Sequence, residues 1–332
     1  MKPKSIISLI IAAALVLAGI ITCVVATVMS KGDGIMLFPE ADKNGNLVYS
    51  MDLDGVSKIT VNVLDADVTV IGGAEKSTIE VVNFNANYYK LNESGGSLNF
   101  AQVEDFMSMF KFWENGFSFK GMRYILRFGD DAPGGKKVII RLTDEDHIRL
   151  VNLVTDTGTV SLENCAFAAD YTLKAENGKA ELRNVTGCQS LSIYGTSAEI
   201  TADKVSTDKL NVNGNTLNTT LTDITAKEGI IKTTDGNVSL ENSTIDSLQL
   251  NTVSGNVSVS PYNCTEGSVT TESGKVTLDF ADTDTFAVNA ATMNGKINVN
   301  GQFTDSFTKS PVDAKYSVSV TTSGGDIYIT HP

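Results

Sequence analysis

Short runs of alternating apolar and polar residues recur along the second half of the chain, and each run follows a turn that usually contains a glycine. The clearest copy is 233–242 (TTDGNVSLEN), where polar turn residues and Gly236 precede the alternating run. The step between copies is about 18–21 residues, with one longer step before the last, and a period of this size predicts a solenoid. The further copies begin at Thr155, Ala175, Thr252, Thr271, Thr292 and Thr322, and weaker copies lie at 196–201 and 213–219.

The repeat 248–259 (LQLNTVSGNVSV) explains why the copies must stack. Side chains on a strand alternate between two faces, so each short run has one apolar face. A single repeat cannot cover that face, whereas stacked repeats cover it and pair their backbones with the repeats above and below. We therefore predict an all-β chain that forms a parallel β-solenoid with two or three short strands and about 20 residues per turn.

The crossover rule for parallel strands predicts that this solenoid is right-handed. The main alternative is a left-handed hexapeptide helix, whose spacings would be strict multiples of six, and the sequence lacks them.

One glycine in most copies holds the same turn position. Glycine is required where the backbone has a positive φ or where another backbone segment approaches closely. We predict that these glycines line up along one edge of the solenoid. They are Gly158, Gly178, Gly236, Gly255, Gly274, Gly295 and Gly325.

The N-terminal segment has the composition of a membrane span. Residues 5–30 carry no charge and are rich in Ile, Leu, Val and Ala. A segment of this length is long enough to cross a bilayer as a helix. Lys2 and Lys4 precede it, so the positive-inside rule places the N-terminus in the cytoplasm and the rest outside. We expect 1–30 to be a retained anchor of a single-pass protein of the cell membrane. The alternative is a cleaved signal peptide.

Beyond the anchor, we expect a polar linker at 31–46 and an extracytoplasmic β-solenoid at 47–332. The segment 300–315 is longer than a normal connection, and we expect it to loop out of one turn of the solenoid. The segment 101–131 interrupts the repeats with many aromatic residues. It either plugs the solenoid core, as terminal caps do, or presents an exposed patch to a partner or the bilayer surface. The candidate partner-binding residues in the second case are Phe110, Trp113 and Phe117.

The net charge of −13 excludes some partners. Nucleic-acid binding depends on phosphate contacts from Lys and Arg, so we expect no nucleic-acid partner. The same charge disfavours adsorption of the whole rod onto an anionic membrane. Abundant Ser, Thr, Asn and Gly with scarce Pro are typical of exported bacterial β proteins.

Three motifs in the first half of the repeat region, followed by the serial T-x-x-G-x-V-x-L copies, carry a family resemblance. They are ITVNVLDADVTV at 59–70, SGGSLNF at 94–100 and KKVIIRLTD at 136–144. Over roughly 56–330 the chain resembles the bacterial putative-adhesin β-strand-repeat family of unknown function. The resemblance implies a β-solenoid of the cell envelope, often with one membrane span and sometimes linked to envelope-stress regulation. It supplies no catalytic residues, and the aromatic insertion departs from the family's pattern.

One arrangement in the repeats suggests an enzyme. Aligning the copies places Glu181 and Glu199 in one outward column on neighbouring turns, with Arg183 nearby, and two carboxylates about 5 Å apart serve retaining glycoside cleavage. Elsewhere the column is a plain solvated face, so we predict a protein that is not an enzyme. The other residues of that column are Ser161, Ser239, Ser258, Thr277 and Asn298.

Metal and disulfide chemistry receive little support. The acidic run 144–147 ends in His147, one of two histidines in the chain, and no H-x-x-x-H or C-x-x-C spacing accompanies it. We interpret the run as an acidic loop and expect neither a metal nor a cofactor. Cys165, Cys188 and Cys264 are odd in number and occupy different positions in their repeats, so we interpret them as small buried residues.

The sequence thus predicts a membrane-tethered, non-catalytic adhesion or binding module of the bacterial cell envelope. Its partner would be an unknown protein or glycan at the cell surface, because repeated outward Ser, Thr and Asn side chains suit many weak contacts. The alternative is an envelope-stress accessory protein that modulates a membrane signalling partner through the aromatic segment. A carbohydrate-active enzyme is the third hypothesis.

Overall fold

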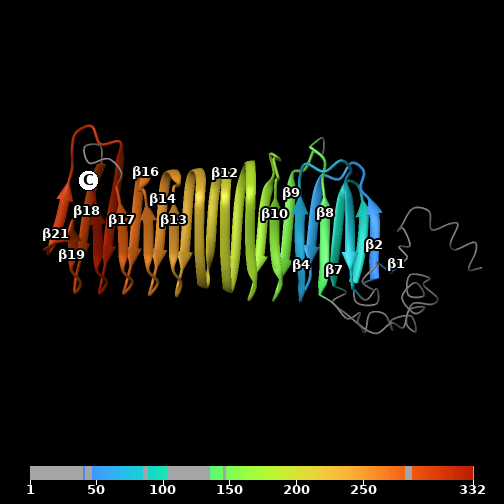
Figure 1. Ribbon diagram of the computed structural model, residues 1–332, viewed down its shortest axis with the longest axis horizontal. Helices are drawn as coiled ribbons and strands as arrows, with labels where there is room; N and C mark the ends of the chain where they lie inside the picture. Colours follow the sequence, from blue (N-terminus) through green and yellow to red (C-terminus); the bar gives the residue numbers. More distant parts are fainter. Residues whose placement is uncertain are drawn as a thin grey trace, which may run out of the picture.

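The computed structural model describes residues 40–41, 47–84, 89–102, 135–144, 147–280 and 286–331. These residues form an elongated rod in which the strands lie side by side across the long axis (Figure 1). Every element in them is a strand, and the 23 strands make one continuous hydrogen-bonded sheet. The all-β prediction is therefore confirmed. No described segment is a helix suited to spanning a membrane, and the expected anchor at 1–30 lies outside the described residues.

The sheet winds into coils, each of which pairs in parallel with its neighbours. We call the two long sides of the coil the first face and the second face. The first face contains part of β12 (Lys179–Thr233) together with β3 (Lys58–Asn62), β7 (Ser97–Gln102), β9 (Leu150–Thr155), β11 (Asp170–Ala175), β14 (Thr244–Thr252), β16 (Asn263–Thr271), β18 (Phe286–Thr292) and β22 (Tyr316–Thr322).

The second face follows the turn in each coil. It contains another part of β12 together with β4 (Ala66–Ile71), β8 (Lys136–Arg141), β10 (Thr159–Glu163), β13 (Val238–Glu241), β15 (Val257–Ser260), β17 (Val276–Asp279), β19 (Ile297–Val299) and β23 (Ile327–Thr330). Neighbouring coils are offset by 20 residues between Asn164 and Asn184 and by 19 residues between Asn237 and Asn256.

The core is built from the inward side chains of these strands. Burial alternates along much of most strands, and Leu250 and Val269, which pair across β14 and β16, are both fully buried. A buried aliphatic side chain of this kind contributes about 1.5–3 kcal/mol. Larger rings fill the core towards its two ends. They are Phe84, Tyr89 and Phe100 towards one end and Tyr262, Phe280 and Phe286 towards the other.

The turn between the two faces is an edge of stacked glycines. A Cβ added to Gly255 would overlap the carbonyl oxygen of Gly236, and one added to Gly274 would overlap that of Gly255. None of these three residues has a positive φ, so close approach of the neighbouring coil is the reason for glycine here. Three residues earlier, a buried threonine accepts a hydrogen bond from the glycine amide, as Thr252 does from Gly255 at 3.1 Å.

The far end of the second face turns through residues with positive φ, which the sequence analysis did not predict. Asn164, Asn184 and Asn242 have φ between 50° and 54°, and Lys204 and Asp223 take the same position in the coils between them. Asn tolerates the left-handed region better than most residues. The side chains also form a ladder, since Asn184 Nδ2 donates to Asn164 Oδ1 at 2.9 Å.

At both ends of the rod, the order of the coils differs from their order in the sequence. The coil β22–β23 lies between β16–β17 and β18–β19. At the other end, β3–β4 lies between β7–β8 and β9–β10. At the first of these ends, the earlier coil β18–β19 is therefore the outer one, and the later coil β22–β23 lies between it and the rest of the rod.

Short antiparallel strands complete both ends. The segment 300–315, expected as a loop, contains β20 (Gln302–Thr304) and β21 (Ser306–Lys309), which pair with β19 and β18. At the opposite end, β2 (Leu47–Asp52) and β5 (Thr78–Val82) pair with each other, and β6 (Tyr89–Ser94) pairs with β7. The two-residue β1 (Glu40–Ala41), inside the expected linker, pairs with β2.

Candidate binding surfaces

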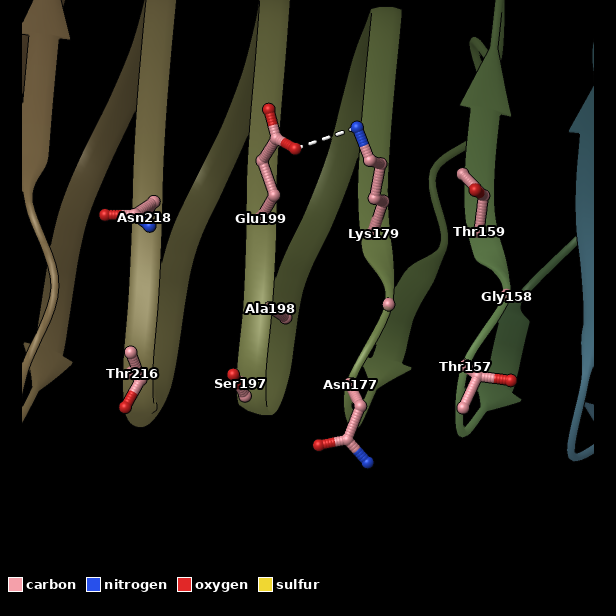
Figure 2. Close-up of a pocket in the computed structure, with 11 residues that line it drawn as sticks. Thr157, Gly158, Thr159, Asn177, Lys179, Ser197, Ala198, Glu199, Thr216 and Asn218 are labelled. Atoms are coloured by element: carbon pink, nitrogen blue, oxygen red, sulfur yellow. Dashed lines mark ion pairs between the residues drawn. The ribbon is translucent and has the colours of Figure 1, made fainter.

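A groove of about 420 Å³ runs along the glycine edge over neighbouring coils (Figure 2). Gly158, Gly178 and Ala198 lie along its floor, where the near absence of side chains leaves the edge hollow. The residues just before and just after these three positions, and the two residues that flank Leu217 in the next coil, form its two sides. They are Thr157, Asn177, Ser197 and Thr216 on one side and Thr159, Lys179, Glu199 and Asn218 on the other.

The charged residues among those that line the groove are Lys179 and Glu199, and they form an ion pair. Lys179 Nζ lies 2.8 Å from Glu199 Oε2, and both side chains are more than half exposed. The Glu199 carboxylate raises the pKa of Lys179 by hydrogen bonding and by its charge. Water screens an exposed pair of this kind, so it contributes little to stability. The other polar side chains of the groove carry hydroxyl and amide groups, which are neutral donors and acceptors of hydrogen bonds.

The predicted carboxylate pair does not form. Glu199 lies beside Lys179, and the backbone amide of Glu199 donates a hydrogen bond to the carbonyl oxygen of Gly178 at 3.2 Å. Glu181 instead continues the column of Ser161, two residues further along the strand. The prediction that Glu181 and Glu199 share one outward column is therefore wrong. A shift of two residues preserves which side chains point outward, so alternation alone does not reveal it.

Arg183 pairs in register with Glu163, not with a pair of glutamates. Within the described residues, no group of three or more His, Cys, Asp or Glu side chains is arranged to hold a metal ion. The middle of the run 144–147 lies outside those residues.

A column of neutral polar side chains follows the outward side of the first face. Two runs of in-register residues define it, and we call them together the polar column. One run is Asn99, Thr60, Asn152, Thr172 and Ser192; the other is Ile230, Gln249, Ser268, Ser319 and Asn289. Nine of these ten residues carry an uncharged amide or hydroxyl group, and all are at least partly exposed.

The family model Toastrack DUF4097 matches residues 56–330, which is most of the chain. The chain belongs to the Toastrack DUF4097 family. The resemblance identified from the sequence is thereby confirmed. A comparison with curated proteins found no match.

Three solved structures resemble the Toastrack chain. A putative cell adhesion protein from Clostridium sporogenes is 13% identical, with 86% of this chain and 99% of that chain covered and a TM-score of 0.18. A putative lipid binding protein from Parabacteroides distasonis is 12% identical, with 85% and 96% covered and a TM-score of 0.36. A putative adhesin from Bacteroides fragilis is 12% identical, with 90% and 100% covered and a TM-score of 0.34.

The cysteines of the Toastrack chain lie inside the coils. Cys165, Cys188 and Cys264 are free and buried. Burial raises the pKa of Cys165 and of Cys264 to about 12, and it also raises the pKa of Cys188. A thiol whose pKa is raised keeps its proton at neutral pH, and a protonated thiol is a poor nucleophile.

The three aromatic candidates Phe110, Trp113 and Phe117 lie outside the described residues. Their role in partner binding stays a prediction. The groove at the glycine edge was missed because Ala198 replaces the glycine that marks the turn in the clearer copies. The polar column was expected only in general terms, as repeated outward Ser, Thr and Asn side chains.

Proposed function

We propose that this Toastrack protein is a non-catalytic binding module on the outer side of the bacterial cell envelope, tethered by the N-terminal anchor expected at 1–30. The observation that carries the proposal is the polar column. It offers hydroxyl and amide groups at the strand spacing of about 4.8 Å along the first face. Each group makes a weak hydrogen bond, and a ligand that spans many coils gains affinity from their number.

Folding alone does not require the column to be uncharged. The rod carries many charges elsewhere, and at one corner they alternate in sign between neighbouring coils. Lys227 Nζ lies 2.7 Å from Asp208 Oδ1, and Lys209 Nζ lies 3.7 Å from Glu228 Oε2. Opposite charges on neighbouring coils are thus accommodated without difficulty. A chain with a net charge of −13 that keeps one whole column neutral favours a ligand rich in hydroxyl and amide groups.

The expected ligand is an extended polymer that lies along the rod. Cell walls supply such polymers, and isolated peptidoglycan sacculi are a suitable probe because they sediment with whatever they bind. We expect the full-length protein, kept in mild detergent, to sediment with sacculi.

Two arginine substitutions separate the column from the rest of the surface. Ser268→Arg places a long charged side chain in the middle of the polar column, and we expect it to reduce sedimentation at least fivefold. Ser239→Arg makes the same change at an outward, partly exposed position of the second face, and we expect it to sediment like the unaltered protein. Equal behaviour of the two variants, or no sedimentation of the unaltered protein, would reject the polar column as the binding surface.

The tether has its own test. A tag placed after Thr330 is expected to be digested by protease added to intact spheroplasts, while a tag at Met1 is expected to survive. Digestion only after lysis would reject the extracytoplasmic placement. Recovery of the chain in the soluble fraction would reject the retained anchor.

A further inference from the structure

Two aromatic side chains, an exposed phenylalanine and a partly exposed tyrosine, lie on the second face at one end of the rod. Tyr328 in β23 and Phe303 in β20 are both in register with Asn298 in β19, from opposite sides. Side chains of directly paired residues point to the same face of a sheet. With strands about 4.8 Å apart, the two rings stand roughly 10 Å from each other with Asn298 between them.

Phe303 contributes little to the core. It is 63% exposed, whereas Phe280 and Phe286 at the same end are buried and stacked with ring centroids 4.0 Å apart. A phenylalanine is usually buried in a folded chain. Together with the partly exposed ring of Tyr328, Phe303 forms a small apolar area on the surface.

Polar groups surround the two rings in a fixed arrangement. Lys275 Nζ lies 4.2 Å from the centroid of the Tyr328 ring, and Lys296 Nζ lies 5.6 Å from that of Phe303. Asn298 Oδ1 accepts a hydrogen bond from Gly301 N at 2.8 Å, which fixes the amide plane. Because the oxygen is engaged, the amide nitrogen of Asn298 is the group available to donate to a ligand.

A carboxylate completes the set. Asp326 Oδ1 accepts a hydrogen bond from the backbone amide of Lys296 at 2.8 Å, which holds the carboxylate between the coils that carry the two lysines. Flat apolar rings, three nitrogen donors and an acceptor thus occur within a few strands of each other. We call these residues the aromatic patch: Tyr328, Phe303, Lys275, Lys296, Asn298 and Asp326.

We propose that the aromatic patch binds a neutral saccharide. A sugar ring has a flat face of C–H groups, which packs on an aromatic ring, and a rim of hydroxyls, which hydrogen-bonds to nitrogen donors and carboxylates. Two rings that lie two strand spacings apart, with an amide between them, match alternate sugar units of an oligosaccharide, with the amide beside the unit between them. The inference rests on the proposed binding role and names the ligand class at one end of the rod.

Other ligand classes fit the aromatic patch less well. A stable protein interface buries about 1,200 Å² or more, far beyond what two rings supply. Adsorption to anionic lipid is opposed by the net charge of −13. Acidic saccharides gain little at the patch itself, because Asp326 offsets one of its two lysines, and the net charge of −13 opposes their approach. A neutral sugar is therefore the ligand that the shape and the charge together favour.

The test uses the full-length protein in detergent with chitohexaose and cellohexaose as neutral probes and hexagalacturonate as the acidic comparator. We expect the neutral hexasaccharides to bind at least tenfold more tightly than hexagalacturonate. Phe303→Ala is expected to weaken neutral binding at least tenfold, and Lys296→Gln severalfold. Met293→Ala is the matched control, because Met293 is a 79% exposed apolar side chain at the same end but outside the aromatic patch. It should bind like the unaltered protein.

Several outcomes would overturn the proposal. They are no binding of either neutral sugar, binding unchanged by Phe303→Ala, or equal loss in Met293→Ala. Binding to phosphatidylglycerol vesicles that needs Phe303, without saccharide binding, would assign the aromatic patch to lipid instead. Saccharide binding that is lost in Ser268→Arg but retained in Phe303→Ala would support the polar column and reject the aromatic patch. The two proposals are thus separable, and thermal unfolding of each variant verifies that its fold is intact.

Discussion

Leu217 occupies the edge position that glycine holds in the neighbouring coil, and Gly214 leaves the space that its side chain needs. A Cβ added to Gly214 would overlap the carbonyl oxygen of Gly195 at 1.9 Å and would lie 2.9 Å from Cδ1 of the fully buried Leu217. In the next coil the equivalent residues are Thr233 and Gly236, since a Cβ on Gly236 would overlap the carbonyl oxygen of Leu217. In one coil the glycine, Gly214, comes first and the inward side chain, Leu217, follows three residues later. In the next coil the order is reversed, since Thr233 carries the side chain and Gly236 is the glycine.

This exchange predicts coupling between the two positions. Gly214→Thr alone is expected to lower the stability by about 1–3 kcal/mol through overpacking, and Leu217→Gly alone by at least 2 kcal/mol through an unfilled cavity. The double variant keeps the overlap with the Gly195 carbonyl oxygen but removes the contact with Leu217 and lets the threonine fill the space that Leu217 leaves, so we expect it to be at least 1 kcal/mol more stable than the sum of the single changes. Urea denaturation of all four proteins measures this, and simple additivity would contradict the exchange.

The glycine edge predicts a large effect from one methyl group. Gly255→Ala places a Cβ against the carbonyl oxygen of Gly236 in the neighbouring coil, where only movement of the backbone relieves the overlap. We expect a loss of about 1–3 kcal/mol. Gly135→Ala is the control, because Gly135 has open space around its Cβ position and no positive φ. It should be neutral or slightly stabilising, and similar unfolding midpoints for the two variants would disprove the close approach.

The left-handed corner predicts a dependence on residue type. Asn242 has a φ of 50° and donates from Nδ2 to Asp223 Oδ1. Asn242→Val is expected to cost about 1–2 kcal/mol, because a β-branched residue fits this conformation poorly. Asn242→Gly loses the hydrogen bond but not the conformation, so it should cost less. If Val proves as well tolerated as Gly in urea denaturation, the strain argument fails.

Buried thiols predict a reactivity that appears only on unfolding. In a Cys23→Ser variant the remaining thiols are Cys165, Cys188 and Cys264, all buried. At pH 8 we expect a thiol reagent such as dithionitrobenzoate to label none of them in the native protein within minutes, and all three in 8 M urea. Fast labelling of the native protein would show that at least one thiol is accessible.

The same thiols make stability depend on pH at the alkaline end. The pKa of Cys165 and that of Cys264 rise from the ordinary 9.0 to about 12 on folding. Below pH 9 both states keep the protons, so stability does not change through these groups. Between pH 9 and 12 the unfolded chain loses them first, so stability falls as pH rises. Replacing both residues with Val should flatten this part of the pH–stability curve, and an unchanged slope would contradict the assignment.

Much of the architecture was predictable because the apolar period is local. The alternation within each strand and the turn glycine of most coils, as at Gly236, Gly255 and Gly274, are visible without knowledge of distant contacts. The left-handed corner was also visible in principle, as the Asn that ends the copies at Asn164 and Asn242, but no apolar signal drew attention to it.

The failures have a common physical cause. Every coil presents a similar apolar face to its neighbours, so the pattern does not specify which coil stacks on which. The exchanged order of β18–β19 and β22–β23 was therefore hidden. The register of Glu199 failed for a related reason, since the turn marker in that coil is Ala198, and a slip of two residues keeps every side chain on its own face.

The exchanged order has a consequence for how the protein assembles. Residues 286–299 leave the ribosome before 316–330, yet their permanent neighbour in the rod is the later segment. The earlier coil therefore either stays undocked until the later segment is synthesised, or first docks on β16–β17 and is then displaced by β22–β23. Shortening the connection at 310–315, which leaves β20 and β21 intact, should favour the arrangement in simple chain order, in which β23 takes the edge of β19 that β20 occupies and Phe303 leaves the aromatic patch.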